Sequence, residues 1–180
     1  MQESGRDRPG EAPRRLVVVR HAKAEPTAPS DHARALAARG RADAAEAGRW
    51  LRDTGIDPDA ALVSDALRTQ QTWEHLADAA GWGLEPDLSA GLYAAGADSA
   101  FDLLRETDPG VTTLVVIGHN PTMAYVAELI DDGEGDVEAT TFLLTRGFPT
   151  SALAVFVVAG EWADLGPGSG RLEAFHVGDG

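Results

Sequence analysis

Two stretches of the chain are rich in β-branched side chains: residues 16–19, which are continuously apolar, and residues 111–117, which are mainly apolar. Such runs are typical of strands that are buried on both faces of a sheet. A shorter apolar run at residues 60–64 predicts another strand. Residues 151–158 and 170–177 predict two late strands, joined by a turn around residues 166–168 where glycines cluster.

Helical periodicity fills the intervals between these runs. Residues 33–52 place apolar side chains at helical spacing, and Gly55 and Pro58 follow as stop signals. A second helix is predicted from about residue 65 to residue 80, with Ser64 as its N-cap and Asp65 in its first turn.

Two more helices are predicted further along the chain. One covers residues 98–106. The other follows Asn120 and Pro121, which suit the cap and the first helical position, and it continues to about residue 130. The acidic, glycine-rich residues 131–136 predict a loop. Strands that alternate with helices favour a single α/β domain with a mainly parallel sheet over residues 14–180. Residues 1–13 are polar and predict a flexible tail.

Composition narrows the possible partners. The chain has 180 residues, a formal net charge of −14 and no cysteine. The negative charge disfavours nucleic acid and anionic membranes as partners, and the missing cysteines exclude disulfides and thiolate chemistry. No run is long enough to cross a bilayer, and the polar N-terminus lacks the apolar core of a signal peptide. We therefore expect a cytoplasmic protein.

Residues able to carry positive charge gather where predicted strands end. Arg20 and His21 follow the first strand, Arg68 comes shortly after the second, and His119 follows the run at residues 111–117. Ligands of parallel α/β sheets bind beyond the carboxyl ends of the strands. Two arginines and two histidines at one such edge predict a pocket for a tetrahedral anion. A neutral imidazole aimed at phosphorus could act there as a nucleophile, and its positive neighbours would lower its pKa.

Three segments carry a family resemblance: RHAKAE, SDALRTQQT and VIGHNP. In this order and spacing they resemble the histidine phosphatase superfamily, and more narrowly its SixA-type phosphohistidine phosphatases. The match extends from about residue 16 to residue 177 and includes DHARALAARGRADA, GLYAAGADSAFDLL and FPTSALAVF. The resemblance implies a phosphoglycerate-mutase-like fold with three layers, α/β/α. It also implies that His21 is the phosphorylated nucleophile, that Arg20 and Arg68 grip phosphate, and that His119 stabilises the transferring phosphoryl group.

Other polar residues receive weaker assignments. Lys23 and Asn120, the lone lysine and asparagine, lie beside the motif histidines. Lys23 either adds positive potential at the rim or has a structural role, and Asn120 is expected to cap a helix. His32, His75 and His176 are expected to be ordinary histidines. No spacing of His, Asp and Glu resembles a metal site, so we expect neither a metal nor another cofactor.

The general acid that many relatives carry has no counterpart in this sequence. Gly91 stands where an acidic residue would precede Leu92 and Tyr93, and neither Asp87 nor Asp98 matches a motif. An imidazole, whose conjugate acid has a pKa of about 6.5, leaves phosphorus with less help than an alkoxide. The gap therefore favours phosphohistidine on a signalling or phosphocarrier protein as the substrate.

Two alternatives to this function remain open from the sequence. One is a small-molecule phosphomonoesterase acting on a sugar phosphate or a nucleotide. The other is a non-catalytic phosphate-binding module, which would have no need of the nucleophile. We expect a monomer that acts either on a phosphohistidine-bearing protein or on a small phosphorylated substrate.

Overall fold

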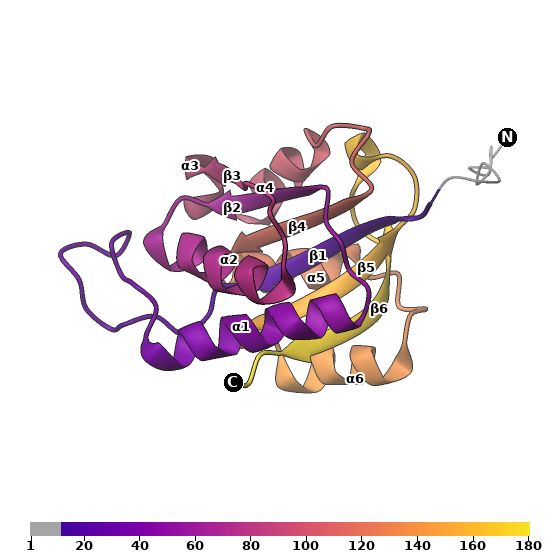
Figure 1. Ribbon diagram of the computed structural model, residues 1–180. Coiled ribbons are helices and arrows are strands. Elements are labelled where there is room, and N and C mark those ends of the chain that lie inside the picture. The colour runs from indigo at the N-terminus through magenta and orange to yellow at the C-terminus, as the bar shows by residue number, and fades with distance from the viewer. Residues whose placement is uncertain (1–11) are drawn as a thin grey trace, which may run out of the picture.

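The computed structural model describes residues 12–180. A twisted sheet of six strands, in the order β3-β2-β4-β1-β5-β6, runs through the middle of the molecule (Figure 1). The strands are β1 (Arg14–Arg20), β2 (Ala60–Ser64), β3 (Asp87–Ser89), β4 (Thr113–Gly118), β5 (Ala152–Val158) and β6 (Gly170–Val177). The expected mainly parallel sheet is confirmed: β3, β2, β4 and β1 pair in parallel, whereas β5 runs antiparallel to both β1 and β6.

Helices cover both faces of the sheet. They are α1 (Ala38–Asp53), α2 (Leu67–Ala80), α3 (Ala90–Tyr93), α4 (Ala97–Arg105), α5 (Thr122–Ile130) and α6 (Val137–Arg146), with a 3-10 turn at Trp162–Asp164. Alternate residues of a strand point to opposite faces. Leu16 and Val18 of β1 accordingly pack with α4 and α5, while Val17 and Val19 pack with α1 and α2. This is the predicted three-layer arrangement.

The two helices on one face approach each other closely. A Cβ atom at Gly48 of α1 would lie 2.1 Å from the backbone oxygen of Leu76 in α2, so only glycine permits this contact. Trp50 of α1 stacks on His176 of β6 with ring centroids 4.6 Å apart, and Glu46 lies 2.8 Å from the imidazole. These contacts fix α1 against the sheet and account for His176 as a structural residue.

Two helices begin two or more residues later than the sequence predicts. The first helix begins at Ala38 instead of residue 33, because the chain before it pairs with the segment after β1: Ala24 and Leu36 form a β-bridge, and the N–H of Glu25 donates to Ala35. The second begins at Leu67, and its N-cap residue is Ala66. Ser64 is therefore not the N-cap, and its hydroxyl has a different partner, described below.

Several elements carried too little sequence signal to be predicted. β3 has three residues and α3 has four, and α6 follows the predicted acidic loop with an exposed apolar residue, Val137, at its start. The predicted late strands and the turn between them are confirmed within a residue. The expected flexible tail falls almost wholly on residues 1–11, which lie outside the described part of the chain.

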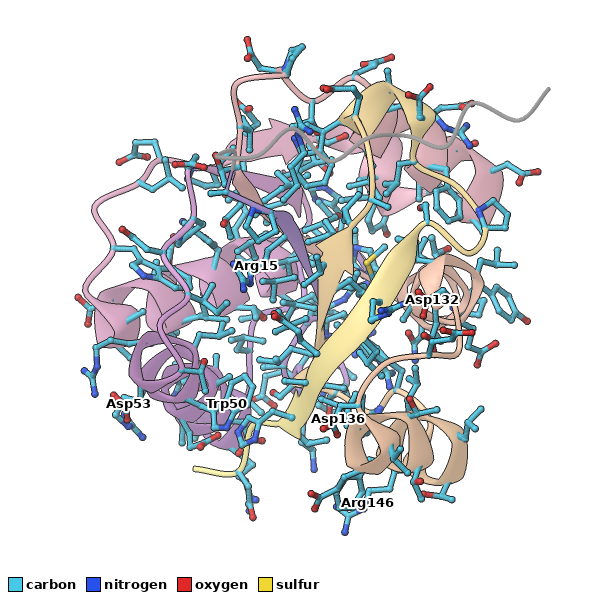
Figure 2. All side chains as sticks on the ribbon, turned by 90° about the vertical axis from the view of Figure 1, so that its right-hand side faces the viewer. Arg15, Trp50, Asp53, Asp132, Asp136 and Arg146 are labelled. Atoms are coloured by element: carbon cyan, nitrogen blue, oxygen red, sulfur yellow. The ribbon has the colours of Figure 1, made fainter. Side chains whose placement is uncertain are left out.

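The carboxyl ends of strands β1, β2 and β4 lie on the same side of the molecule, on the left in Figure 1. The long connection between β1 and α1 projects from this side. Figure 2 shows the opposite side of the molecule, where these strands begin and where Arg15 and Asp53 lie. Within residues 12–180, no helix combines the length and apolarity that a membrane span requires.

Candidate active site

Three strand ends bring the motif residues together. Arg20 lies opposite Gly118 in the parallel register of β1 and β4, and the N–H of His21 donates to the Gly118 carbonyl at 3.1 Å. His21 and His119 therefore follow adjacent strands, and their ring centroids lie 5.3 Å apart. The strand-end prediction for these two residues is confirmed in position, and α2 brings Arg68 to the same place.

His21 is oriented by its neighbour in the chain. Its Nδ1 lies 2.7 Å from the carbonyl oxygen of Ala22. Because a carbonyl can only accept, Nδ1 carries the hydrogen and Nε2 keeps a free lone pair. The Ala22 N–H in turn donates to Thr72 Oγ1 of α2 at 3.0 Å, which fixes the segment after β1. The ring is 9% exposed, so it is held in a largely dry position with Nε2 available for attack.

His119 is bound through both ring nitrogens. Its Nδ1 lies 3.2 Å from an Nη atom of Arg68, and its Nε2 lies 2.7 Å from Ser64 Oγ. A guanidinium can only donate, so Nδ1 is the acceptor and Nε2–H donates to Ser64. The sequence prediction of Ser64 as a helix cap is wrong because this hydroxyl, 0% exposed at the end of β2, binds the second histidine.

The two arginines have different surroundings. Arg68 lies in the first turn of α2 with a side chain 8% exposed, whereas Arg20 is half-buried at the end of β1 and donates to the Phe148 carbonyl at 3.1 Å. In the part of the chain that the structure describes, the Nε atoms of both are buried without a hydrogen-bond partner. Both guanidinium groups therefore retain donors for an anion.

A carboxylate from the connection between β1 and α1 joins this group. Asp31 Oδ2 accepts from Arg68 at 3.1 Å and from the Tyr93 hydroxyl at 2.6 Å, and Asp31 Oδ1 accepts from Arg34 at 3.0 Å. The Tyr93 ring lies edge-on to His119 with centroids 5.5 Å apart. Asp31, Arg34 and Tyr93 were not singled out as site residues from the sequence, since the contacts of Asp31 with Arg68 and Tyr93 join segments far apart in the chain.

The electrostatics keep both histidines neutral. Burial, together with the smaller effects of the charges on Arg68, Arg20 and Arg34, lowers the pKa of His21 to about 4 against the opposing effect of the Ala22 hydrogen bond. Burial also lowers the pKa of His119 to about 3, helped by His21 and Arg68. The predicted direction for His21 is confirmed, although burial contributes more than the positive neighbours.

The carboxyl group of Asp31 shifts in the way expected of an ion-paired acid. The hydrogen bonds from Tyr93, Arg34 and Arg68 hold the pKa of Asp31 well below its usual range. The same contact raises the pKa of Tyr93, because ionising its hydroxyl would place two negative charges together. Asp31 is therefore a carboxylate throughout the neutral range.

The remaining candidates are not part of the quartet formed by Arg20, His21, Arg68 and His119. Asn120 Oδ1 accepts from the Ala124 N–H and Nδ2 donates to Phe148. The N-cap residue of α5 is nevertheless Pro121 and the helix begins at Thr122, so the predicted cap and first helical residue each lie one residue too early. The side chain of Lys23 is exposed, and its backbone carbonyl accepts from Ala37. Asp87 and Asp98 are exposed, on β3 and in the first turn of α4.

Neither His32 nor His75 belongs to the quartet. His32 Nε2 lies 2.9 Å from Asp65, and His75 is half-buried on α2. Within residues 12–180, no group of three His, Asp or Glu side chains is placed to hold a metal ion.

Comparison with known proteins identifies the family. The profile of the histidine phosphatase superfamily (branch 1) matches residues 16–93. The solved structure of a SixA protein from Nakamurella multipartitia is 31% identical, covers 91% of this chain and 95% of its own, and superposes with a TM-score of 0.77. The chain belongs to the histidine phosphatase superfamily.

Two other relatives match most of this histidine phosphatase. An uncharacterized protein of Mycobacterium tuberculosis is 39% identical over 160 residues, which are 88% of this chain and 99% of the relative. Phosphohistidine phosphatase SixA of Escherichia coli is 29% identical over 129 residues, which are 70% of this chain and 80% of that protein. The phosphoglycerate-mutase-like fold expected from the motifs is thus confirmed.

Proposed function

We propose that this histidine phosphatase removes phosphate from phosphohistidine on a signalling or phosphocarrier protein. In this proposal residues 14–180 form one catalytic domain that acts as a monomer in the cytoplasm and needs neither a metal nor another cofactor. His21 and His119 are its catalytic residues, and Arg20 and Arg68 bind the phosphate. The observation that carries the proposal is the geometry of Asp31, the one carboxylate hydrogen-bonded to these four residues within the described part of the chain, whose oxygens accept from Arg68, Tyr93 and Arg34.

The first step transfers the phosphoryl group to the enzyme. The lone pair of His21 Nε2 attacks phosphorus while the bond to the leaving group breaks, and the leaving atom keeps the bonding electron pair. The neutral state of His21, the hydrogen bond that holds Nδ1–H on Ala22, and the free Nε2 all support this role. Arg20, Arg68 and His119 stabilise the charge on the transferring group, and water then attacks the phosphohistidine, which releases phosphate.

The leaving group decides between the possible substrates. An alkoxide needs a proton as it departs, and a carboxylate with a pKa far below its usual range cannot supply one. Phosphohistidine protonated on its distal ring nitrogen leaves as neutral imidazole, since that nitrogen already carries the hydrogen. The site therefore suits cleavage of P–N bonds without a general acid.

A protein substrate has two further supports. SixA of Escherichia coli, which matches over most of both chains, is named for phosphohistidine. The carboxylate beside the quartet is also 54% exposed, so this side of the site is open to a surface residue of a partner. A small-molecule phosphomonoesterase is the alternative, and it would require Asp87 or Asp98 to reach the site. A phosphate-binding module without catalysis would leave the neutral, oriented His21 unexplained.

The test compares leaving groups on one enzyme. We expect kcat/KM for phosphohistidine protein and for aryl phosphates to exceed kcat/KM for alkyl phosphates, with values that fall as the basicity of the leaving group rises. Dephosphorylation of His21, measured by single turnover, should not vary along the series. A flat dependence of kcat/KM on leaving-group basicity would show that a general acid acts and would refute the proposal. Assays with and without a chelator should give the same rates.

A further inference from the structure

The Asp31 carboxylate accepts hydrogen bonds from three side chains: two guanidinium groups and one hydroxyl. Arg68 comes from α2, Tyr93 from the end of α3, and Arg34 from the same connection as Asp31 itself. Arg68 also donates to the backbone carbonyl of Asp31 at 2.8 Å. Both the backbone and the side chain of Asp31 are thus tied to a phosphate-binding arginine, which fixes the carboxylate beside the quartet.

The carboxylate lies on the solvent side of this group. The Arg68 side chain is 8% exposed, whereas the Asp31 side chain is 54% exposed. Arg68 and Tyr93 each contact both Asp31 and His119. The Asp31 carboxylate is therefore separated from the His119 imidazole by the thickness of a single side chain. A group that departs from phosphorus toward solvent therefore passes this negative charge.

The carboxylate also has capacity for another donor. Two carboxylate oxygens offer about four acceptor positions. Tyr93 and Arg68 use two on Oδ2, and Arg34 uses one on Oδ1. An acceptor position on the exposed carboxylate therefore remains for an N–H donor of a ligand.

We propose that Asp31 is a specificity-determining residue that selects neutral or cationic leaving groups by accepting a hydrogen bond from them. This inference rests on the proposed function. In phosphohistidine, the donor is the N–H of the distal ring nitrogen. His21 Nε2 forms its bond to phosphorus, the P–N bond breaks, and the electron pair stays on the departing nitrogen. The distal N–H remains on the ring facing Asp31, so neutral imidazole leaves and no proton has to be supplied.

The same charge disfavours anionic leaving groups. Two unit charges about 6 Å apart near a protein surface, at an effective dielectric constant of about 40–80, interact by an amount that corresponds to about threefold to tenfold in rate. Substrates such as phosphorylated carboxylic acids would meet this repulsion, whereas a protonated phosphohistidine would be attracted. Arg20 and Arg68 bind the phosphoryl group that all these substrates share, so they cannot discriminate among leaving groups. Asp31 would provide that discrimination.

Three aryl phosphates with closely similar phenols test the charge effect alone. They are 4-ethylphenyl phosphate, tyramine O-phosphate with a cationic tail, and 3-(4-phosphooxyphenyl)propionate with an anionic tail. At low ionic strength, the wild type should show kcat/KM in the order cation, neutral, anion, with about threefold to tenfold per charge. Asp31→Asn should bring the three values to within about twofold of each other, and Asp31→Glu should keep their order.

The ratio among the three substrates is internal to each variant, so a general loss of activity from a displaced Arg68 does not affect it. The matched control is Asp53→Asn, which makes the same change in net charge on the opposite edge of the molecule (Figure 2) and should keep the wild-type ratio. A wild-type ratio of one, or a ratio retained in Asp31→Asn, would overturn the inference. The ratio could instead be lost in Asp31→Asn while the wild type fails to hydrolyse phosphohistidine protein. That result would refute the proposed function and leave the role of Asp31 intact.

Discussion

Replacing Ser64 with alanine tests whether His119 depends on a buried hydroxyl. Ser64 is 0% exposed, and its Oγ lies 2.7 Å from His119 Nε2. Because Arg68 can only donate to Nδ1, the Nε2–H of His119 must point at Ser64. Alanine would leave this N–H without its acceptor in a dry site. A buried donor that loses its partner costs about 1–3 kcal/mol.

The loss should appear in the rate, because His119 must be oriented when charge develops on the phosphoryl group. About 1–3 kcal/mol corresponds to roughly 5-fold to 150-fold in kcat/KM. The assay uses an aryl phosphate, and nitrogen NMR of the imidazole reports which nitrogen carries the hydrogen. Thr113→Ala is the matched control, since it removes a buried hydroxyl at the far end of β4.

Two outcomes would refute this reasoning. In one, Ser64→Ala keeps kcat/KM within twofold of the Thr113→Ala control, so that the hydroxyl has no role in orienting His119. In the other, the wild type shows the hydrogen of His119 on Nδ1. The assignment of donor and acceptor around this ring would then be wrong.

Two further predictions concern His21. Its replacement by alanine should abolish hydrolysis, and brief reaction of the wild type with a labelled phosphodonor should leave acid-labile label on His21; retention of more than about a few per cent of activity would exclude its role as nucleophile. The free energy of unfolding should fall as the pH drops from about 6.5 to about 4, because the unfolded chain then binds a proton that folded His21, with its lowered pKa, does not. His21→Ala should weaken this slope in denaturant titrations, and an unchanged slope would contradict the lowered pKa.

The sequence predicted the quartet because its chemistry coincides with a strong local signal. Arg20, His21 and His119 directly follow the most apolar runs of the chain, and parallel strands that end at one edge bring such residues together. Arg68 had a weaker signal, because it lies four residues after the end of the second apolar run. Its position near a strand end placed it in the predicted anion pocket, the family resemblance added its phosphate-gripping role, and in the structure it contacts His119.

The surroundings of the quartet were harder to predict because they depend on long-range contacts. Asp31 contacts Arg68 and Tyr93, which are 37 and 62 residues away in the sequence. The predicted helix start at residue 33 was wrong for the same reason, since the chain there is drawn into a bridge with Ala24. Ser64 looked like a helix cap because local patterns cannot show that a histidine 55 residues away will bind its hydroxyl.

The ion pair between Arg68 and Asp31 offsets the free-energy cost of burying the Arg68 cation. A guanidinium whose side chain is 8% exposed loses most of its hydration, and such a charge is costly unless it is paired. Asp31 supplies that pairing, and its own cost of burial is small because its side chain is 54% exposed. A phosphoryl group that takes over the donors of Arg68 would still leave Arg34 and Tyr93 on the Asp31 carboxylate. The carboxylate that pairs with Arg68 would then stay beside the site as the negative charge that a leaving group encounters.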